Sequence, residues 1–335
     1  MGVRKMLEKI LRGVLTLVLT CASVAAAATP YTSITVFGDS LSDGGNAYAY
    51  TEAIFGPGNG FPPAPYAQRF SNGPVAVERL AANLGLSLTP SLLGGSNYAY
   101  GGAETGSTNY LRLNSNPLVA AAFSGSNTGV LAQVADFTSL HSLNPSSLVV
   151  LWAGPNDLFS ALDSAADPVA AMSLALFNLQ LATQQLYLDG ARTILMPNMP
   201  NIGLTPFGLS LGAAASAQLT GITVGFNTGL HLLADALNAA DPGLNILEFD
   251  TFSLLNSLIN NPADYGLSNV TQPCFNGVAV CANPDSYLFW DSVHPTTSAH
   301  QVIGDRFTTT VPEPPLTALM AVALIGLYAS RRRKR

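Results

Sequence analysis

The sequence predicts an α/β domain with a mostly parallel sheet that helices cover on both faces. Four short apolar runs have the composition of β-strands, and the long segments between them carry alanine and leucine at helical spacing. Strands that alternate with helices form βαβ units, whose parallel sheet is buried on both sides. The expected strands are 33–37, 148–152, 193–196 and 245–249, and the clearest helices are 169–189 and 213–240.

The segment from residue 29 to residue 309 is expected to form one domain. It contains no repeat with a period of about 20–50 residues and no block of like charges that would mark an internal linker. The stretch 56–65 is rich in glycine and proline and is predicted to be a surface loop. Both ends of the chain have the composition of targeting segments and are set aside from the fold.

Residues 1–28 have the composition of a secretory signal peptide. Basic residues precede the apolar stretch 13–24, and small residues at 25–28 suit cleavage. The apolar stretch is shorter than the roughly 20 residues of a comfortable bilayer span, which favours cleavage over a retained anchor. The alternative is lipoprotein processing at Cys21, but Thr20 is larger than the residue that such processing prefers.

The tail, residues 310–335, consists of an apolar run at 315–330 and a basic cluster at 331–335. A basic cluster behind an apolar run favours the cytoplasmic side, so the tail predicts transient insertion into the inner membrane. With the Pro-Glu-Pro motif at 312–314, it resembles a PEP-CTERM tail. The resemblance implies processing by an exosortase in a Gram-negative bacterium that makes exopolysaccharide. An ordinary tail anchor is the alternative.

Charge and cysteine usage narrow the classes of function. Outside the two ends the cations are five arginines and there is no lysine, which argues against nucleic-acid binding because that requires clustered cations. Cys274 and Cys281 are separated by six residues and, after export, would meet an oxidising compartment, so a disulfide is expected. No histidine pair lies near them, so a metal site is not expected there.

The strand expected at 33–37 runs directly into Gly38, Asp39, Ser40 and Leu41. In an open parallel sheet, ligands gather beyond the carboxyl ends of the strands, so Ser40 is well placed for chemistry. Gly38 permits a tight exit from the strand, and the next turn can aim backbone N–H groups at a developing oxyanion. Taken alone, however, an ordinary turn between a strand and a helix would use the same residue types.

Further segments join this Gly-Asp-Ser-Leu run, and together they resemble the sequence blocks of the GDSL, or SGNH, family of serine esterases and lipases. The resemblance extends from Ile34 to about Arg306. It implies a flavodoxin-like three-layer α/β/α hydrolase fold that uses no metal or organic cofactor. The segments are Asn-Tyr-Ala-Tyr-Gly-Gly-Ala at 97–103, Leu-Trp-Ala-Gly-Pro-Asn-Asp at 151–157, Asp-Ser-Val-His-Pro at 291–295 and Arg-Phe-Ser-Asn-Gly-Pro at 69–74.

The resemblance also implies an oxyanion hole, the set of N–H donors that stabilises the charged oxygen of the intermediate. Its expected donors are Ser40, the backbone N–H of Gly102 and the side chain of Asn156. Gly101 stays open as the alternative to Gly102, because the register of the match is ambiguous by one residue.

A serine hydroxyl becomes a strong nucleophile only when a base removes its proton, and neutral histidine has a suitable pKa. His294 is the predicted base for Ser40, and Asp291 is expected to hold the ring nitrogen that faces away from the serine. Pro295 favours an extended backbone at His294. His141, His231 and His300 show no such partners in the sequence and are predicted to be structural; they complete the four histidines of the chain.

A second serine motif competes with the first. Residues 208–212 read Gly-Leu-Ser-Leu-Gly, which matches the nucleophile elbow of α/β-hydrolases around Ser210. An elbow must leave a strand directly, but the nearest expected strand ends at Met196 and a turn-rich stretch follows it. The sequence therefore favours Ser40.

The predicted function is hydrolysis of carboxylic esters by an exported serine enzyme, in the periplasm, at the cell surface or outside the cell. The family resemblance leaves the substrate open among lipids, short acyl esters and acetylated sugars. One alternative is a non-catalytic protein of the exopolysaccharide matrix or of adhesion, which would give no reason for the four candidate site residues to occur together. The other is a peptidase that uses the same triad.

Overall fold

The structure, a computed structural model, describes residues 31–312 and is built around a parallel sheet with the order β1-β2-β3-β4. The predicted α/β class with a parallel sheet is confirmed. The strands expected from the sequence agree with these four within one residue at each end. The strands are β1 (Ser33–Gly38), β2 (Ser147–Trp152), β3 (Thr193–Pro197) and β4 (Asn245–Phe249).

A fifth segment occupies the outer side of β1. Val36 forms a parallel bridge with Asn97, its N–H donates to Ser96 O at 3.0 Å, and its carbonyl accepts from the Tyr98 N–H at 2.7 Å. Counted with this segment, the strands follow the order 2-1-3-4-5 of flavodoxin-like folds. The chain therefore brings residues 96–100 to the carboxyl end of β1.

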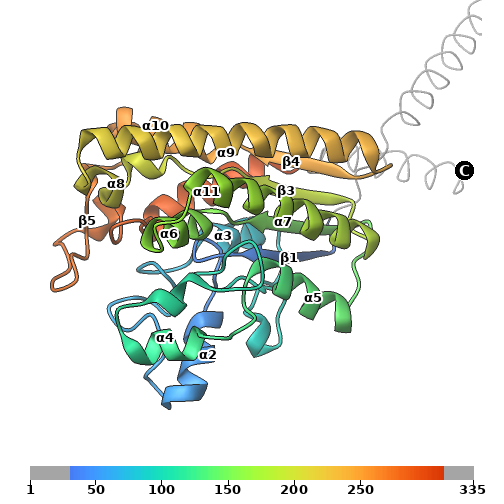
Figure 1. Cartoon of the computed structure of the whole chain (residues 1–335), viewed down its shortest axis with the longest axis horizontal. Helices are drawn as coiled ribbons and strands as arrows, with labels where there is room; N and C mark the ends of the chain where they lie inside the picture. Colours follow the sequence, from blue (N-terminus) through green and yellow to red (C-terminus); the bar gives the residue numbers. More distant parts are fainter. Residues whose placement is uncertain (1–30, 313–335) are drawn as a thin grey trace, which may run out of the picture. The chain divides into compact units, whose positions relative to one another are not determined.

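Helices cover both faces of the sheet (Figure 1). Val149 and Leu151 of β2 pack in one apolar cluster with α5, α7 and α9, whereas Leu148, Val150 and Trp152 pack on the other side with α3 and α11. This alternation follows from the two-residue period of a strand. The covering helices are α3 (Ala76–Asn83), α5 (Val130–Leu140), α7 (Pro168–Leu188), α9 (Ala213–Ala240) and α11 (Thr297–Thr310).

The long helices α7 and α9 match their expected ranges to within one residue, because alanine and leucine dominate both. Helix α9 runs along the upper margin of the domain in Figure 1. A small two-stranded sheet was not expected; it pairs β5 with β6. The remaining elements are α2 (Asn46–Phe55), α4 (Pro117–Phe123), α6 (Pro155–Asp163), α8 (Pro206–Ser210), α10 (Thr251–Asn260), β5 (Asn269–Pro273) and β6 (Tyr287–Phe289).

The expected signal peptide at 1–28 and the tail from residue 313 onward lie outside the described residues. Between residues 31 and 312, no helix has both the length and the apolar character to cross a membrane. The predicted loop at 56–65 connects α2 to the segment that precedes α3, and it contains no helix or strand.

Candidate functional site

Ser40 lies two residues beyond the end of β1 and is 8% exposed. The backbone of Gly38 is fixed there by Gln133 of α5, whose Oε1 accepts from the Gly38 N–H at 2.9 Å and whose Nε2 donates to Gly38 O at 2.8 Å. The Asp39 carboxylate accepts from the Leu41 N–H at 3.0 Å and so shapes the turn that carries the serine. Gln133 was not singled out from the sequence, because nothing local links it to a residue 95 positions away.

The structure brings the three predicted residues Ser40, His294 and Asp291 into one hydrogen-bonded line. His294 Nε2 lies 2.8 Å from Ser40 Oγ, and His294 Nδ1 lies 2.7 Å from Asp291 Oδ2. Asp291 Oδ1 accepts from the backbone N–H groups of Val293 and His294, at 2.9 and 2.8 Å, so the short loop folds around its own carboxylate. The spacing of three residues therefore orients the histidine ring as expected.

Tyr66 is a further partner of this carboxylate. Its hydroxyl donates to Asp291 Oδ2 at 2.8 Å. Burial and the charge of Asp291 raise the pKa of Tyr66 far above its ordinary value, so the phenol stays protonated and remains a donor. Burial alone would raise the pKa of Asp291, but the charge of His294 and the hydrogen bonds from His294 and Val293 outweigh it and hold that pKa below its ordinary value. Asp291 is thus ionised at neutral pH.

The candidate oxyanion donors converge beside Ser40. Gly102 and Asn156 line the same cavity as the serine. Within residues 31–312, the backbone N–H groups of Ser40 and Gly102 have no hydrogen-bond partner. Asn156 Nδ2 donates one hydrogen to Ala103 O at 3.0 Å, which fixes the amide and leaves its second hydrogen available. These groups form a set of donors from which an anionic oxygen can accept hydrogen bonds.

The open choice between Gly101 and Gly102 depends on Asp43. The Gly101 N–H donates to Asp43 Oδ2 at 2.8 Å, so it is already engaged. The same buried carboxylate accepts from the N–H groups at the start of α2, including those of Gly45 and Asn46. Gly102 adopts φ +77°, and a Cβ there would lie 2.4 Å from Asn109 Oδ1. Gly102 is therefore the better donor candidate.

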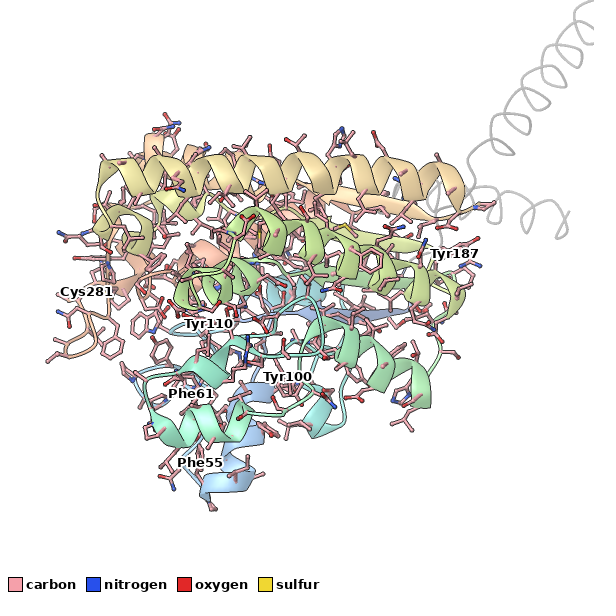
Figure 2. All side chains as sticks on the ribbon, in the orientation of Figure 1. Phe55, Phe61, Tyr100, Tyr110, Tyr187 and Cys281 are labelled. Atoms are coloured by element: carbon pink, nitrogen blue, oxygen red, sulfur yellow. A yellow bond between two sulfur atoms is a disulfide. The ribbon has the colours of Figure 1, made fainter. Side chains whose placement is uncertain are left out.

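The cavity beside Ser40 has mostly apolar walls. Tyr110, which is labelled in Figure 2, and Phe159 contribute aromatic rings, and Leu254, Leu255 and Leu258 of α10 contribute aliphatic side chains. The titratable side chains in its wall are Asp39, Tyr110 and His294, of which Asp39 and His294 adjoin Ser40. Burial raises the pKa of Asp39 to about 7, against the opposing effects of the Leu41 hydrogen bond and the charge of His294.

The predicted disulfide between Cys274 and Cys281 is present; Cys281 lies on the loop at the left margin of Figure 2. This loop is joined to the strand that leads to Asp291, because the Cys274 N–H donates to Phe289 O at 3.0 Å. Tyr66 packs edge-on against Phe275 of the same loop, with ring centroids 5.7 Å apart. The disulfide therefore stabilises the loop that packs against Tyr66, the residue that donates to Asp291.

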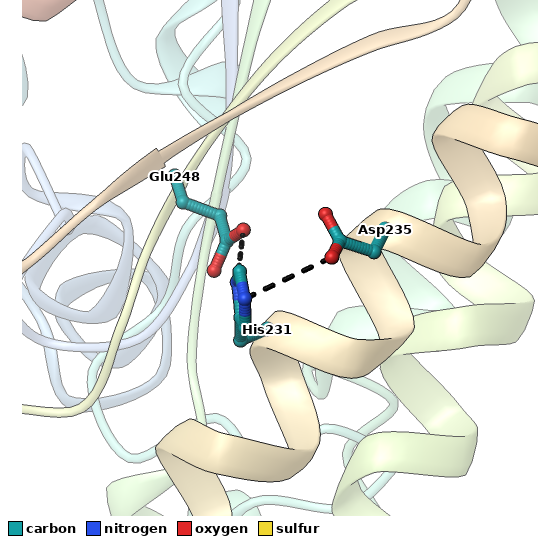
Figure 3. Close-up of side chains that lie close together, drawn as sticks. All are labelled: His231, Asp235 and Glu248. Carbon is teal, nitrogen blue, oxygen red and sulfur yellow. Dashed lines mark hydrogen bonds and ion pairs between the residues drawn. The ribbon is translucent and has the colours of Figure 1, made fainter.

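His231 differs from its prediction, because it does have carboxylate partners. Its Nδ1 lies 2.9 Å from Glu248 Oε1 and its Nε2 lies 3.7 Å from Asp235 Oδ2 (Figure 3). Glu248 comes from strand β4, and no local pattern in the sequence links it to His231. The ligand atoms of this exposed trio lie within 4.8 Å of one another, close enough to hold a metal ion. Ion pairing alone accounts for the geometry, since hydrogen bonding to Glu248 and the two negative charges raise the pKa of His231.

His300 fits its structural prediction. It is buried, and its Nδ1 accepts from the Ala76 N–H at 3.2 Å, which ties α11 to α3. Burial and the nearby charge of His294 lower the pKa of His300 to about 3, so its ring stays neutral.

Comparisons with known proteins give related matches. Residues 34–307 match the sequence profile of a family described as GDSL-like Lipase/Acylhydrolase. The chain is 27% identical to Lipase 1 of Photorhabdus luminescens over 92% of this chain and 54% of that protein, so it spans about half of that relative's length. It is 25% identical to phosphatidylcholine-sterol acyltransferase of Aeromonas hydrophila, over 83% of this chain and 90% of that protein. Among solved structures, a member of the lipolytic protein G-D-S-L family from Veillonella parvula is 14% identical with a TM-score of 0.45, over 83% of this chain and 97% of that one.

Proposed function

The chain belongs to the GDSL-like lipase/acylhydrolase family and is a carboxylic ester hydrolase, and on this premise we propose that Ser40 is its nucleophile and His294 its general base. The observation that carries the assignment is the continuous line from Ser40 Oγ to His294 Nε2, at 2.8 Å, and from His294 Nδ1 to Asp291, at 2.7 Å. A serine in this arrangement loses its proton to the imidazole as it attacks.

The reaction has two halves. Ser40 Oγ attacks the ester carbonyl carbon while His294 Nε2 takes the serine proton, and Asp291 stabilises the imidazolium that forms. The negative oxygen of the tetrahedral intermediate accepts hydrogen bonds from the N–H groups of Ser40 and Gly102 and from Asn156 Nδ2. His294 then protonates the departing alcohol, which leaves an acyl group on Ser40. In the second half, His294 activates water, and its attack releases the acid and restores the serine.

Location belongs to the proposal as well. A signal peptide at 1–28 would export the domain at 29–309, and the tail at 310–335 would insert into the inner membrane until an exosortase removes it. The disulfide between Cys274 and Cys281 is consistent with an oxidising compartment. C-terminal sequencing of the mature protein from an exosortase-bearing host tests this route, and recovery of Arg335 at the end of the chain would contradict it.

Covalent labelling tests the nucleophile directly. A fluorophosphonate probe should modify the mature protein once, and the peptide that contains Ser40 should carry the added mass. The probe should not label protein in which His294 is changed to alanine, because the serine then lacks its base. Labelling at Ser210 or the absence of any labelling would overturn the assignment.

A further inference from the structure

We propose that the apolar cavity beside Ser40 binds the acyl chain of the substrate, and that the enzyme prefers esters with an extended alkyl chain, such as octanoate, to acetylated sugars. This inference rests on the proposed function, because it takes Ser40 as the point to which the acyl group is attached. It concerns the walls of the cavity beyond the reacting atoms.

The cavity is lined by Ser40 and by apolar side chains from three separate elements, α10, β6 and α11. Leu254, Leu255 and Leu258 of α10 line it, together with Leu288 of β6 and Ile303 of α11. Leu258 and Leu288 are each 1% exposed and pack in a single apolar cluster with Leu255. A chain that enters here is therefore surrounded by hydrocarbon.

The walls offer few partners to a polar ligand. Thr205 is already engaged, since its hydroxyl donates to Ile202 O at 2.7 Å and accepts from the Gly208 N–H. The Trp152 indole N–H donates to Asn198 O at 3.2 Å, so its ring can offer the cavity only carbon surface. Thr251 Oγ1 is a buried atom with no partner among the described residues. The wall also holds Asp39, whose Oδ2 has no partner among the described residues. Sugar rings carry several hydroxyls that each need a partner when buried, and these two oxygens cannot supply them all.

The size of the cavity also favours an alkyl chain. The cavity volume is about 130 Å³, which is small for a small-molecule site, so the cavity accommodates a slender chain better than a sugar ring. An acetyl group attached to Ser40 would leave most of these leucines without a contact. Each methylene placed against them adds about 0.8 kcal/mol, or roughly fourfold, in transfer free energy.

Chain-length selectivity gives the first test. The readout is the ratio of kcat/KM for p-nitrophenyl octanoate to that for the acetate. We expect the unmodified protein to favour octanoate, and Leu258→Phe to lower the ratio by about ten- to a hundredfold because the added ring fills the cavity. Leu140→Phe is the matched control, since Leu140 is 79% exposed on α5. An unchanged ratio in Leu258→Phe would overturn the proposal.

Thr251→Val separates an alkyl chain from a polar ligand. The two side chains have nearly the same shape, but valine lacks the hydroxyl. An alkyl chain gains apolar contact, so the octanoate-to-acetate ratio should stay the same or rise. A fall of tenfold or more would mean that the hydroxyl binds a polar group of the substrate, and the acyl-chain assignment would be wrong.

Fluorescence tests binding without catalysis. Trp152 lines the cavity, whereas Trp290, the second of the two tryptophans, packs against Tyr66 and Phe275. Ser40→Ala protein titrated with 11-bromoundecanoate should lose Trp152 emission, because bromine quenches on contact. The same titration of Ser40→Ala with Trp152→Phe should leave the remaining emission unchanged.

The two assays distinguish the possible failures. Absence of quenching, with p-nitrophenyl acetate still hydrolysed by the unmodified protein, would refute the acyl site and leave the proposed function intact. Quenching without hydrolysis of any ester would keep the binding site and refute the proposed function, and with it the substrate preference.

Discussion

Two serines of this chain lie in motifs typical of hydrolases, but their surroundings differ. Ser40 is buried directly after β1, and its hydroxyl lies 2.8 Å from His294 Nε2. Ser210 is exposed at the end of α8, and its hydroxyl donates to Phe207 O at 2.7 Å within its own helical turn. The strand before it, β3, ends at Pro197, so the elbow context that Gly-x-Ser-x-Gly requires is missing.

Distance from the loop that holds His294 does not by itself explain why Ser40 and Ser210 differ. Helix α8 contacts the loop that holds the histidine, since the Phe207 N–H donates to Ser292 O at 2.8 Å. A serine on a helix has a local carbonyl to satisfy its hydroxyl, whereas the turn after β1 presents Ser40 to the imidazole. The backbone that carries each serine therefore decides which of them can react.

The largest expected effect separates these two serines. Ser40→Ala should lower kcat/KM for ester hydrolysis by about 10⁴-fold or more, because it removes the nucleophile. Ser210→Ala should stay within about twofold of the unmodified protein, since its hydroxyl binds only its own helix. Steady-state rates with p-nitrophenyl butyrate measure both. Reversed effects would make Ser210 the nucleophile.

Asn156 is a candidate oxyanion donor beside Ser40, and Ser210 has no such donor among the described residues. Removing Asn156 therefore tests what distinguishes the two serines. Asn156→Ala should reduce kcat about 10²- to 10³-fold through the loss of one oxyanion donor. Asn238→Ala is the control, because this change also removes side-chain hydrogen bonds to the backbone, in this case those with Ile246. Both variants should melt at slightly lower temperatures, but only Asn156→Ala should lose turnover. Equal rates in the two variants would remove Asn156 from the site.

The buried carboxyl before Ser40 predicts a pH-dependent stability. The pKa of Asp39 is raised from 3.8 to about 7 by burial, so the folded state keeps this proton when the unfolded state has lost it. The free energy of unfolding should therefore fall as pH rises from about 4 to about 7. The residue before Ser210 is Leu209, so this serine has no carboxyl at the equivalent position.

Asp39→Asn tests this dependence with a neutral side chain of the same shape. Relative to the unmodified protein, the variant should gain roughly 3 kcal/mol between pH 4 and pH 8, since each pKa unit is worth about 1.4 kcal/mol. Urea unfolding at both pH values measures the difference in the free energy of unfolding between the variant and the unmodified protein. The contributions of the other buried carboxyls cancel in this difference, because both proteins contain them. Parallel stability curves would contradict the raised pKa.

Tyr66 should have the smallest effect, because it acts through Asp291 as a positioning residue. Tyr66→Phe removes the hydrogen bond to Asp291 Oδ2 and should lower kcat by up to about tenfold, the worth of one bond to a charged group. KM should stay unchanged, because Tyr66 does not line the cavity. Tyr265→Phe, which loses a contact with Ser257, is the control. A rise in KM with an unchanged kcat would contradict the positioning role.

The sequence by itself determined the elements whose signals are local. The four strands and helices α7 and α9 follow from runs of apolar residues with a clear period. The contact between Asp291 and His294 could be predicted because both lie on one short loop in a segment that resembles a block of the GDSL family. Ser40 could be singled out because it closely follows a strand and lies in another such block. The disulfide was foreseeable because its two cysteines are close in sequence.

Only the tertiary structure decided the features that join distant segments. Asp43 engages the Gly101 N–H across 58 positions and so distinguishes it from Gly102, and Tyr66 reaches Asp291 across 225. The wall of the apolar cavity includes residues of α10, β6 and α11, whose leucines and isoleucine alone predict only a core. Such contacts carry no local period or spacing, because they arise when the sheet and its covering helices pack, and the packing fixes which buried polar groups find partners.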